Sequence, residues 1–151
     1  MKKMMTIVIL SFLFLACFNS QKEKNYNFIK GLNEYQKNDK VSALENYKKA
    51  YEMDKNNIVL LNEIAYLYVD LGNYEEALKY YLIIINSGEL DNDIYKKTWV
   101  LSEIAYIYQN IDKYEEALEY FKKLEKIVVG DYQFYLDHAY CLIFVNHGNR
   151  T

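Results

Sequence analysis

Residues 62–81 read NEIAYLYVDLGNYEEALKYY, and residues 102–121 read SEIAYIYQNIDKYEEALEYF. Eleven of the twenty positions are identical between the two stretches. Each stretch has apolar residues at helical spacing on both sides of a short polar turn, so each predicts a pair of helices. Because such a unit cannot bury its apolar face without neighbours, the repetition predicts an all-α solenoid in which successive units stack.

The repeated unit resembles the tetratricopeptide repeat, a helix–turn–helix unit of 34 residues. In that family small residues recur at positions 8 and 20 of each unit. When Ala77 is placed at position 20, the second unit covers residues 58–91 and the third covers residues 98–131, with Ala65 and Ala105 at position 8. The resemblance implies a right-handed α-solenoid of about three repeats plus one C-terminal helix.

A weaker first unit covers residues 24–57, with Gly31 at position 8 and Ala43 at position 20. Glu34 stands at position 11, where the family has an aromatic residue. We expect the whole repeat domain to occupy residues 26–146.

The second and third units are separated by an insertion. Ala77 and Ala117 lie 40 residues apart, six more than one period, and the extra residues fall around positions 88–97. This predicts a lengthened turn, with or without an added first turn on the helix that carries Trp99. The inserted residues either form part of a binding surface or are sequence drift that a surface loop tolerates.

One more helix is expected over residues 132–145, with Ala139 at the small position, followed by a tail at residues 147–151. This helix is apolar around most of its circumference, and its partner helix is missing from the sequence. Such a surface is typical of an interface with a partner or a second copy, or of a repeat that has been cut short. Both alternatives remain open.

The N-terminus has the pattern of an export signal. Lys2 and Lys3 precede an apolar run over residues 4–18, as in a secretory signal peptide. As a helix this run would be about 22 Å long at roughly 1.5 Å per residue. Since a bilayer core is roughly 30 Å thick, a stable membrane span is disfavoured.

The signal ends in Phe-Leu-Ala-Cys at residues 14–17, which resembles the bacterial lipobox, with Phe14 where leucine is usual. The resemblance implies cleavage of residues 1–16 and lipid attachment to Cys17. Residues 17–25 are then the lipidated cysteine and a short, mostly polar spacer. The alternative is that Cys17 is a bystander in an ordinary cleaved signal or a short uncleaved anchor. No aspartate follows Cys17, which slightly favours the outer membrane in a cell that has two.

Composition excludes several classes of function. The net charge of −3 argues against binding nucleic acid through its phosphates, and two cysteines cannot form a disulfide scaffold. The chain has no glycine-rich phosphate loop, GxSxG elbow or CxxC pair, so we expect no enzyme and no cofactor. His138 and Cys141 are three residues apart and lack further donors nearby, so core packing is favoured over a metal-carrying or catalytic role.

The resemblance also implies a binding groove lined by the first helix of each unit. Its expected partner-binding residues are Asn62, Tyr66, Trp99, Ser102, Tyr106 and Tyr140. The three tyrosines form a ladder along the groove or, alternatively, pack on neighbouring repeats.

Charge in the predicted groove indicates the kind of partner. Glu63 and Glu103 lie among the groove positions and no lysine does, so a neutral or basic protein or peptide fits better than an acidic C-terminus. These features predict a lipid-anchored scaffold of the bacterial cell envelope that binds a partner protein, with possible self-association through the last helix. An unlipidated secreted or periplasmic binding module is the main alternative, and an envelope enzyme or metal carrier a lesser one.

Overall fold

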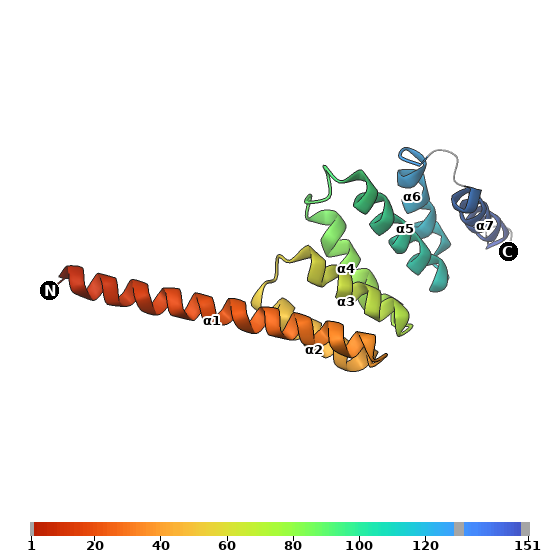
Figure 1. Ribbon diagram of the computed structural model, residues 1–151. Helices are drawn as coiled ribbons and strands as arrows, with labels where there is room; N and C mark the ends of the chain where they lie inside the picture. Colours follow the sequence, from red (N-terminus) through yellow and green to blue (C-terminus); the bar gives the residue numbers. More distant parts are fainter. Residues whose placement is uncertain (1, 129–131, 149–151) are drawn as a thin grey trace. The chain divides into compact units, whose positions relative to one another are not determined.

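The structure is a computed structural model that describes residues 2–128 and 132–148. The described part of the chain is all-α, which confirms the predicted fold class (Figure 1). Its helices are α1 (Lys2–Gln36), α2 (Lys40–Met53), α3 (Ile58–Asp70), α4 (Tyr74–Asn86), α5 (Ile94–Asn110), α6 (Tyr114–Glu125) and α7 (Tyr132–Gly148). The chain divides into two compact units, Met1–Ile64 and Ala65–Thr151, with the boundary inside α3.

In the first unit, α2 packs against the second half of α1 (Figure 1). The two helices approach closely at Gly31, which is buried. A Cβ atom at this position would lie 2.6 Å from the Tyr47 ring and 3.3 Å from the carbonyl oxygen of Ala43. This contact explains why the first unit has glycine at the small position.

The first half of α1 extends beyond α2 (Figure 1). Its described side chains from Ile9 to Phe18 are exposed. Among residues 2–128 and 132–148, no helix combines the length and apolar character needed to cross a membrane. Residues 18–25, expected as a spacer, continue α1 without a break. Packing of the first unit already begins there, because Lys24 Nζ pairs with Asp54 Oδ2 at 2.9 Å.

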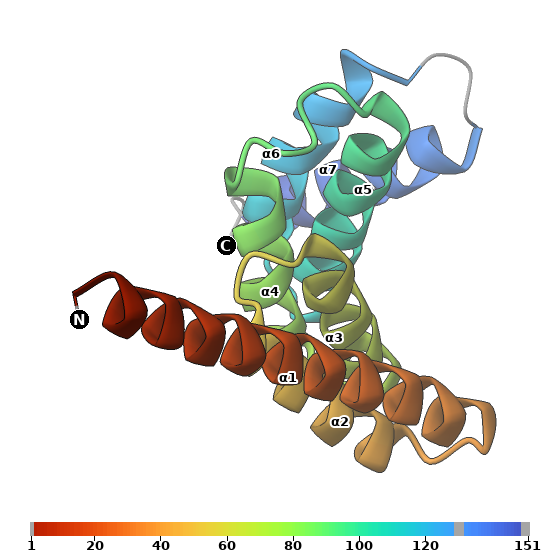
Figure 2. The same cartoon turned by 60° about the vertical axis from the view of Figure 1, so that its left-hand side comes forward.

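The second compact unit, Ala65–Thr151, contains the rest of α3 and the helices α4 to α7. Within it α4 contacts α5, α5 contacts α6, and α6 contacts α7 (Figure 2). The small residues at repeat positions 8 and 20 are completely buried, as expected; they are Ala65, Ala77, Ala105 and Ala117. Since an alanine side chain ends at Cβ, these positions allow the paired helices to pack closely.

The turn inside each repeat has a left-handed residue at the same place. Gly72 has φ +73°, Asp112 has φ +58° and Asn38 has φ +64°. This conformation ends a helix and suits glycine best, with asparagine and aspartate next. The second helix of the unit then starts two residues later, at Lys40, Tyr74 or Tyr114.

The insertion between the second and third repeats lengthens both the turn after α4 and the helix α5 that follows it. Gly88 takes φ +76° after the end of α4, and Asp93 caps α5 by accepting a hydrogen bond from the Lys96 backbone N–H. Helix α5 begins at Ile94, four residues before Thr98, which holds position 1 of the third unit. The added first turn that the sequence allowed is therefore present.

Helix α7 extends three residues beyond the expected end, to Gly148. Its Cys141 is completely buried, like Ile107 at the corresponding position of α5. Ala139, in contrast, is exposed although its counterpart Ala105 is buried. The reason is that Ala105 packs in a cluster with residues of α6, whereas no described helix occupies the equivalent place beside α7.

Candidate functional site

Two of the predicted groove tyrosines repeat the same contact in successive repeats. Tyr106 of α5 lies edge-on to Tyr74, with ring centroids 6.4 Å apart, and Tyr140 of α7 lies edge-on to Tyr114 at 6.2 Å. Tyr74 and Tyr114 are the first residues of α4 and α6. The exposed fractions of Tyr106 and Tyr140 are still 47% and 49%. Each tyrosine thus packs on the preceding helix pair and also offers surface to a partner.

Tyr106 and Tyr140 line one pocket of about 600 Å³ in the second unit. The other residues of this pocket are Gln109, Asn110, Asp112, Tyr114 and Asp137. We call these seven residues the tyrosine pocket. It brings together the C-terminal half of α5, the turn before α6 and one side of α7.

Hydrogen bonds hold the lining of the tyrosine pocket in place. The Tyr114 hydroxyl donates to Asp112 Oδ1 at 2.8 Å. Gln109 Nε2 donates to the backbone carbonyl of Asp137 at 3.2 Å and lies 3.2 Å from Cys141 Sγ, which links α5 to α7. The hydrogen bond to Asp112 is the largest cause that raises the pKa of Tyr114 to about 12. Tyr114 is therefore neutral at physiological pH and keeps its proton.

Phe144 supports the aromatic wall. Its ring stacks on Tyr114 with centroids 4.8 Å apart and lies 4.6 Å from the Tyr140 ring. Aromatic contacts at these distances are favourable beyond the area that they bury. The rings of Tyr114 and Tyr140 are thus held by a third ring and not only by the helix backbone.

Two glutamates at position 6 of their units are half-buried. Burial raises the pKa of Glu63, in the second repeat, and of Glu103, in the third repeat. Partial removal from water disfavours the charged form of a carboxylate. Each charge would therefore be stabilised by a cationic group supplied from outside the helix.

The remaining predicted groove residues are placed differently. Trp99 is partly exposed and lies edge-on to the buried Tyr81, with centroids 5.7 Å apart. Asn62 is half-buried and belongs to the compact unit Met1–Ile64, whereas Tyr66 is exposed and belongs to the compact unit Ala65–Thr151. Ser102 is exposed; its hydroxyl donates to the Thr98 carbonyl at 3.0 Å, so only the oxygen is left to accept a hydrogen bond, and its groove role stays a prediction.

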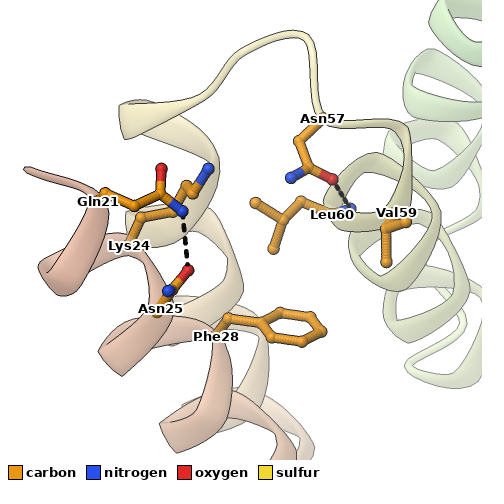
Figure 3. A pocket seen from close by; sticks show the side chains of 7 residues that line it. All are labelled: Gln21, Lys24, Asn25, Phe28, Asn57, Val59 and Leu60. Atoms are coloured by element: carbon orange, nitrogen blue, oxygen red, sulfur yellow. Dashed lines mark hydrogen bonds between the residues drawn. The ribbon is translucent and has the colours of Figure 1, made fainter.

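The first unit has a smaller pocket, of about 300 Å³ (Figure 3). It is lined by Gln21, Lys24, Asn25, Phe28, Asn57, Val59 and Leu60. Figure 3 shows Phe28 and Leu60 pointing into the space between α1 and the start of α3. Gln21 Nε2 donates to Asn25 Oδ1 at 3.1 Å, and Asn57 Oδ1 accepts from the Leu60 backbone N–H at 3.2 Å.

His138 and Cys141 take part in packing. The His138 ring stacks on Phe121 with centroids 5.7 Å apart, and burial is the main cause that raises the pKa of the Cys141 thiol. A buried thiol with a raised pKa is a poor nucleophile and a poor metal ligand. Within the described residues, no group of three or more histidine, cysteine or acidic side chains is placed to hold a metal ion.

Several residues that line the two pockets were not among the predicted groove residues. Asp112 lies in the repeat turn and Tyr114 begins α6, whereas Asp137 lies about one turn of helix before Tyr140. Asn25 and Phe28 hold positions 2 and 5 of the first repeat, the same positions that Trp99 and Ser102 hold in the third, so the repeat pattern already indicates them. No sequence signal places Asp112 beside α7, since that proximity depends on how α6 and α7 pack.

Stacked helix pairs with a polar and aromatic pocket between them define a helical-repeat scaffold. The chain belongs to the tetratricopeptide repeat family, whose sequence model matches residues 11–143. This fold is typically a protein-binding scaffold rather than an enzyme. No curated protein matches the sequence significantly.

Solved structures show the same fold at low sequence identity. The chain is similar to the N-terminal domain of stress-induced protein-1 from C. elegans, with a TM-score of 0.67, 18% identity, and coverage of 81% of this chain and 96% of that one. The chain is also similar to the first TPR domain of Spaghetti bound to the HSP90 peptide SRMEEVD. The TM-score is 0.64 at 16% identity, with coverage of 83% of this chain and 94% of that one. The TPR2AB domain of yeast Sti1, in its complex with pHSP90, gives 0.64 at 18% identity and covers 85% of this chain. The chain spans about half the length of that Sti1 structure, with 50% covered.

Proposed function

We propose that this protein is a lipid-anchored scaffold of the bacterial cell envelope that binds a partner protein or peptide through its repeat groove. The observation that carries the proposal is that Tyr106 and Tyr140, from successive first helices, line one pocket while about half of each side chain stays exposed. Half-exposed aromatic side chains on a rigid scaffold are suited to bind partners. The peptide in the Spaghetti structure supports a peptide segment as the ligand of such a fold.

The partner segment is neutral or basic. Glu63 and Glu103 are half-buried carboxylates at groove positions, and Asp112 and Asp137 line the tyrosine pocket. An acidic segment would be repelled by these charges, whereas a basic one would be attracted. This protein therefore differs in ligand charge from the Spaghetti domain, whose peptide carries the acidic sequence EEVD.

The N-terminal segment serves export and anchoring. The apolar side chains from Ile9 to Phe18 are exposed and do not pack on α2. This exposure supports cleavage of the N-terminal segment during export or its insertion into a membrane. Cys17 is exposed and its thiol is free, so the thiol is accessible for attachment of lipid. Several acyl chains on one cysteine hold a protein to a membrane stably, whereas a single chain does not.

Site-specific photocrosslinking tests the groove. A benzophenone amino acid placed at Ser102, an exposed residue of α5 at a predicted groove position, should crosslink a partner in envelope membranes. The same group at Glu119, an exposed residue of α6, serves as the matched control and should crosslink little. Undiminished capture at Ser102 after Tyr66→Ala combined with Tyr106→Ala would remove the groove from the proposal.

Mass spectrometry of the mature N-terminus tests the anchor. We expect a chain that begins at Cys17 and carries lipid, and a Cys17→Ser variant that is not lipidated and is released from membranes. A cleaved chain with an unmodified Cys17 would instead support the second candidate, an unlipidated secreted or periplasmic binding module.

A further inference from the structure

The tyrosine pocket has the composition of a site for an organic cation. Three of its seven lining residues are tyrosines, two are aspartates and two are amides, and none is lysine or arginine. We infer that the pocket selects an arginine side chain of the partner segment. This inference rests on the proposed function, since the arginine is carried by the bound protein.

The aromatic residues supply one half of the recognition. Tyr106 and Tyr140 are each about half-exposed where they line the pocket, and Phe144 holds the ring of Tyr140 in place. A planar guanidinium stacks on such rings and is attracted by their electron-rich faces. Because the rings are already ordered by packing, a bound cation does not need to immobilise them.

The carboxylates supply the other half. Asp112 Oδ1 accepts one hydrogen bond from Tyr114, and an ionised carboxylate has about four acceptor sites, so acceptor capacity remains. Asp137 places a second carboxylate in the same lining. A guanidinium offers five N–H donors in a fixed, planar arrangement, whereas an ammonium offers three. The guanidinium can therefore reach both carboxylates of the pocket more readily than an ammonium can.

The side chains around the pocket favour a cation over an anion. Lys113 adjoins Asp112 in sequence, but it is exposed and is not one of the lining residues. The hydroxyl proton of Tyr114 and the amide protons of Gln109 are directed to Asp112 and to α7. The donors that an anion would need are thus largely in use, while the acceptors that a cation needs are present.

Titration with a pair of isosteric probes tests this inference. The full chain, ¹⁵N-labelled and held in a neutral maltoside detergent, is titrated with N-acetyl-arginine methylamide and separately with N-acetyl-citrulline methylamide. Citrulline has the shape of arginine without its charge. We expect saturable amide shifts at Asn110, Asp112 and Tyr140 with the arginine probe, and at least tenfold weaker binding of the citrulline probe. Equal shifts with both probes would overturn the inference.

Variants assign the selectivity to named groups. Asp112→Asn combined with Asp137→Asn should lower the affinity for the arginine probe at least fivefold. The double variant should then bind the arginine and citrulline probes about equally. Asparagine tolerates the left-handed backbone at position 112, so this double variant should remain folded. Tyr106→Phe keeps the ring and should bind nearly normally, whereas Tyr106→Leu should bind several-fold more weakly. Glu119→Gln, which removes one exposed carboxylate outside the pocket, is the control and should leave the binding of both probes unchanged.

The outcome is separable from that of the proposed function. If the arginine probe fails to bind while Ser102 still crosslinks a partner, the pocket does not select arginine but the groove still binds protein. If the probe binds selectively and Ser102 captures nothing, the cation site stands and the partner-binding function falls.

Discussion

Gly31 shows how one side-chain atom limits the packing of the first unit. The Tyr47 ring occupies the space that a Cβ atom would need, and the Ala43 carbonyl lies on the same side. Tyr47 is itself buried and in contact with Phe28, with ring centroids 5.7 Å apart, so the ring cannot easily withdraw. The space around Gly31 is therefore part of the packing of α1 on α2.

Gly31→Ala should destabilise the protein by about 1–3 kcal/mol, the usual cost of overpacking, even though alanine favours helix by about 1 kcal/mol over glycine. The free energy of unfolding in urea, followed by circular dichroism, measures the change. In a Tyr47→Leu background the penalty should shrink, because the ring atoms that clash are gone. A penalty that is unchanged in that background would contradict the proposed cause.

Glu103 gives a prediction for pH. Burial raises its pKa in the folded protein above the ordinary value of 4.5, so the folded state binds the proton more tightly than the unfolded state. Stability should therefore fall as the pH rises from 4.5 through the raised pKa. Glu103→Gln should increase the unfolding free energy at pH 7 by less than about 1 kcal/mol, because the side chain is partly exposed.

The gain from Glu103→Gln should narrow as the pH is lowered toward 4.5. Urea denaturation at a series of pH values measures it. Glu119→Gln, at an exposed position of the neighbouring helix, is the control and should show no such trend. A gain that is constant over the whole range would argue against burial of the charge.

At the scale of the helix, the second helices of the repeats differ at their N-termini. Asp39 caps α2 and Asn73 caps α4, in each case by accepting a bond from a backbone N–H three residues on. At the start of α6 the same position is held by Lys113, whose side chain makes no capping bond. The backbone angles of Lys113, φ −96° and ψ 70°, nearly equal those of Asn73, φ −93° and ψ 73°.

Lys113→Asn should therefore stabilise the protein by about 1 kcal/mol, since the new side chain can accept the bond that α6 now lacks. The reverse experiment, Asn73→Ala, should cost a similar amount. The urea midpoint of each variant reports the change. No change in the Lys113→Asn variant would mean that the start of α6 does not accept this cap.

At the scale of the whole molecule, a solenoid is stabilised mainly by contacts between neighbours, so its ends are less well covered than its middle. In the compact unit Ala65–Thr151, α5 contacts both α4 and α6, whereas α7 packs mainly on α6 and is linked to α5 through Gln109. Large side chains of α7 remain exposed, namely Tyr140, Leu142, Ile143 and Phe144.

Amide hydrogen exchange should therefore be on the order of tenfold faster in α7 than in α5. Hydrogen-exchange mass spectrometry at two protein concentrations measures this and also tests self-association through α7, which stays a prediction. Slower exchange confined to α7 at the higher concentration would support association between copies. Equal protection of α5 and α7 at low concentration would contradict the idea of a weakly covered end.

Sequence patterns alone determined the helix pairs, their order and the close packing at Ala65, Ala77, Ala105 and Ala117. These features depend on local periodicity and on side-chain size, which can be read from one chain. The same patterns predicted that Tyr106 and Tyr140 share a surface, because both recur at one repeat position.

Only the tertiary structure decided what surrounds those tyrosines. Asp112 and Asp137 meet in one pocket because the turn before α6 packs beside α7, and Ala139 is exposed because no described helix packs on that side. Ser102 uses its hydroxyl within its own helix, which a position in a repeat does not reveal. Periodicity specifies which face of a helix is apolar, whereas contacts between segments far apart in sequence depend on how the helices are placed in space.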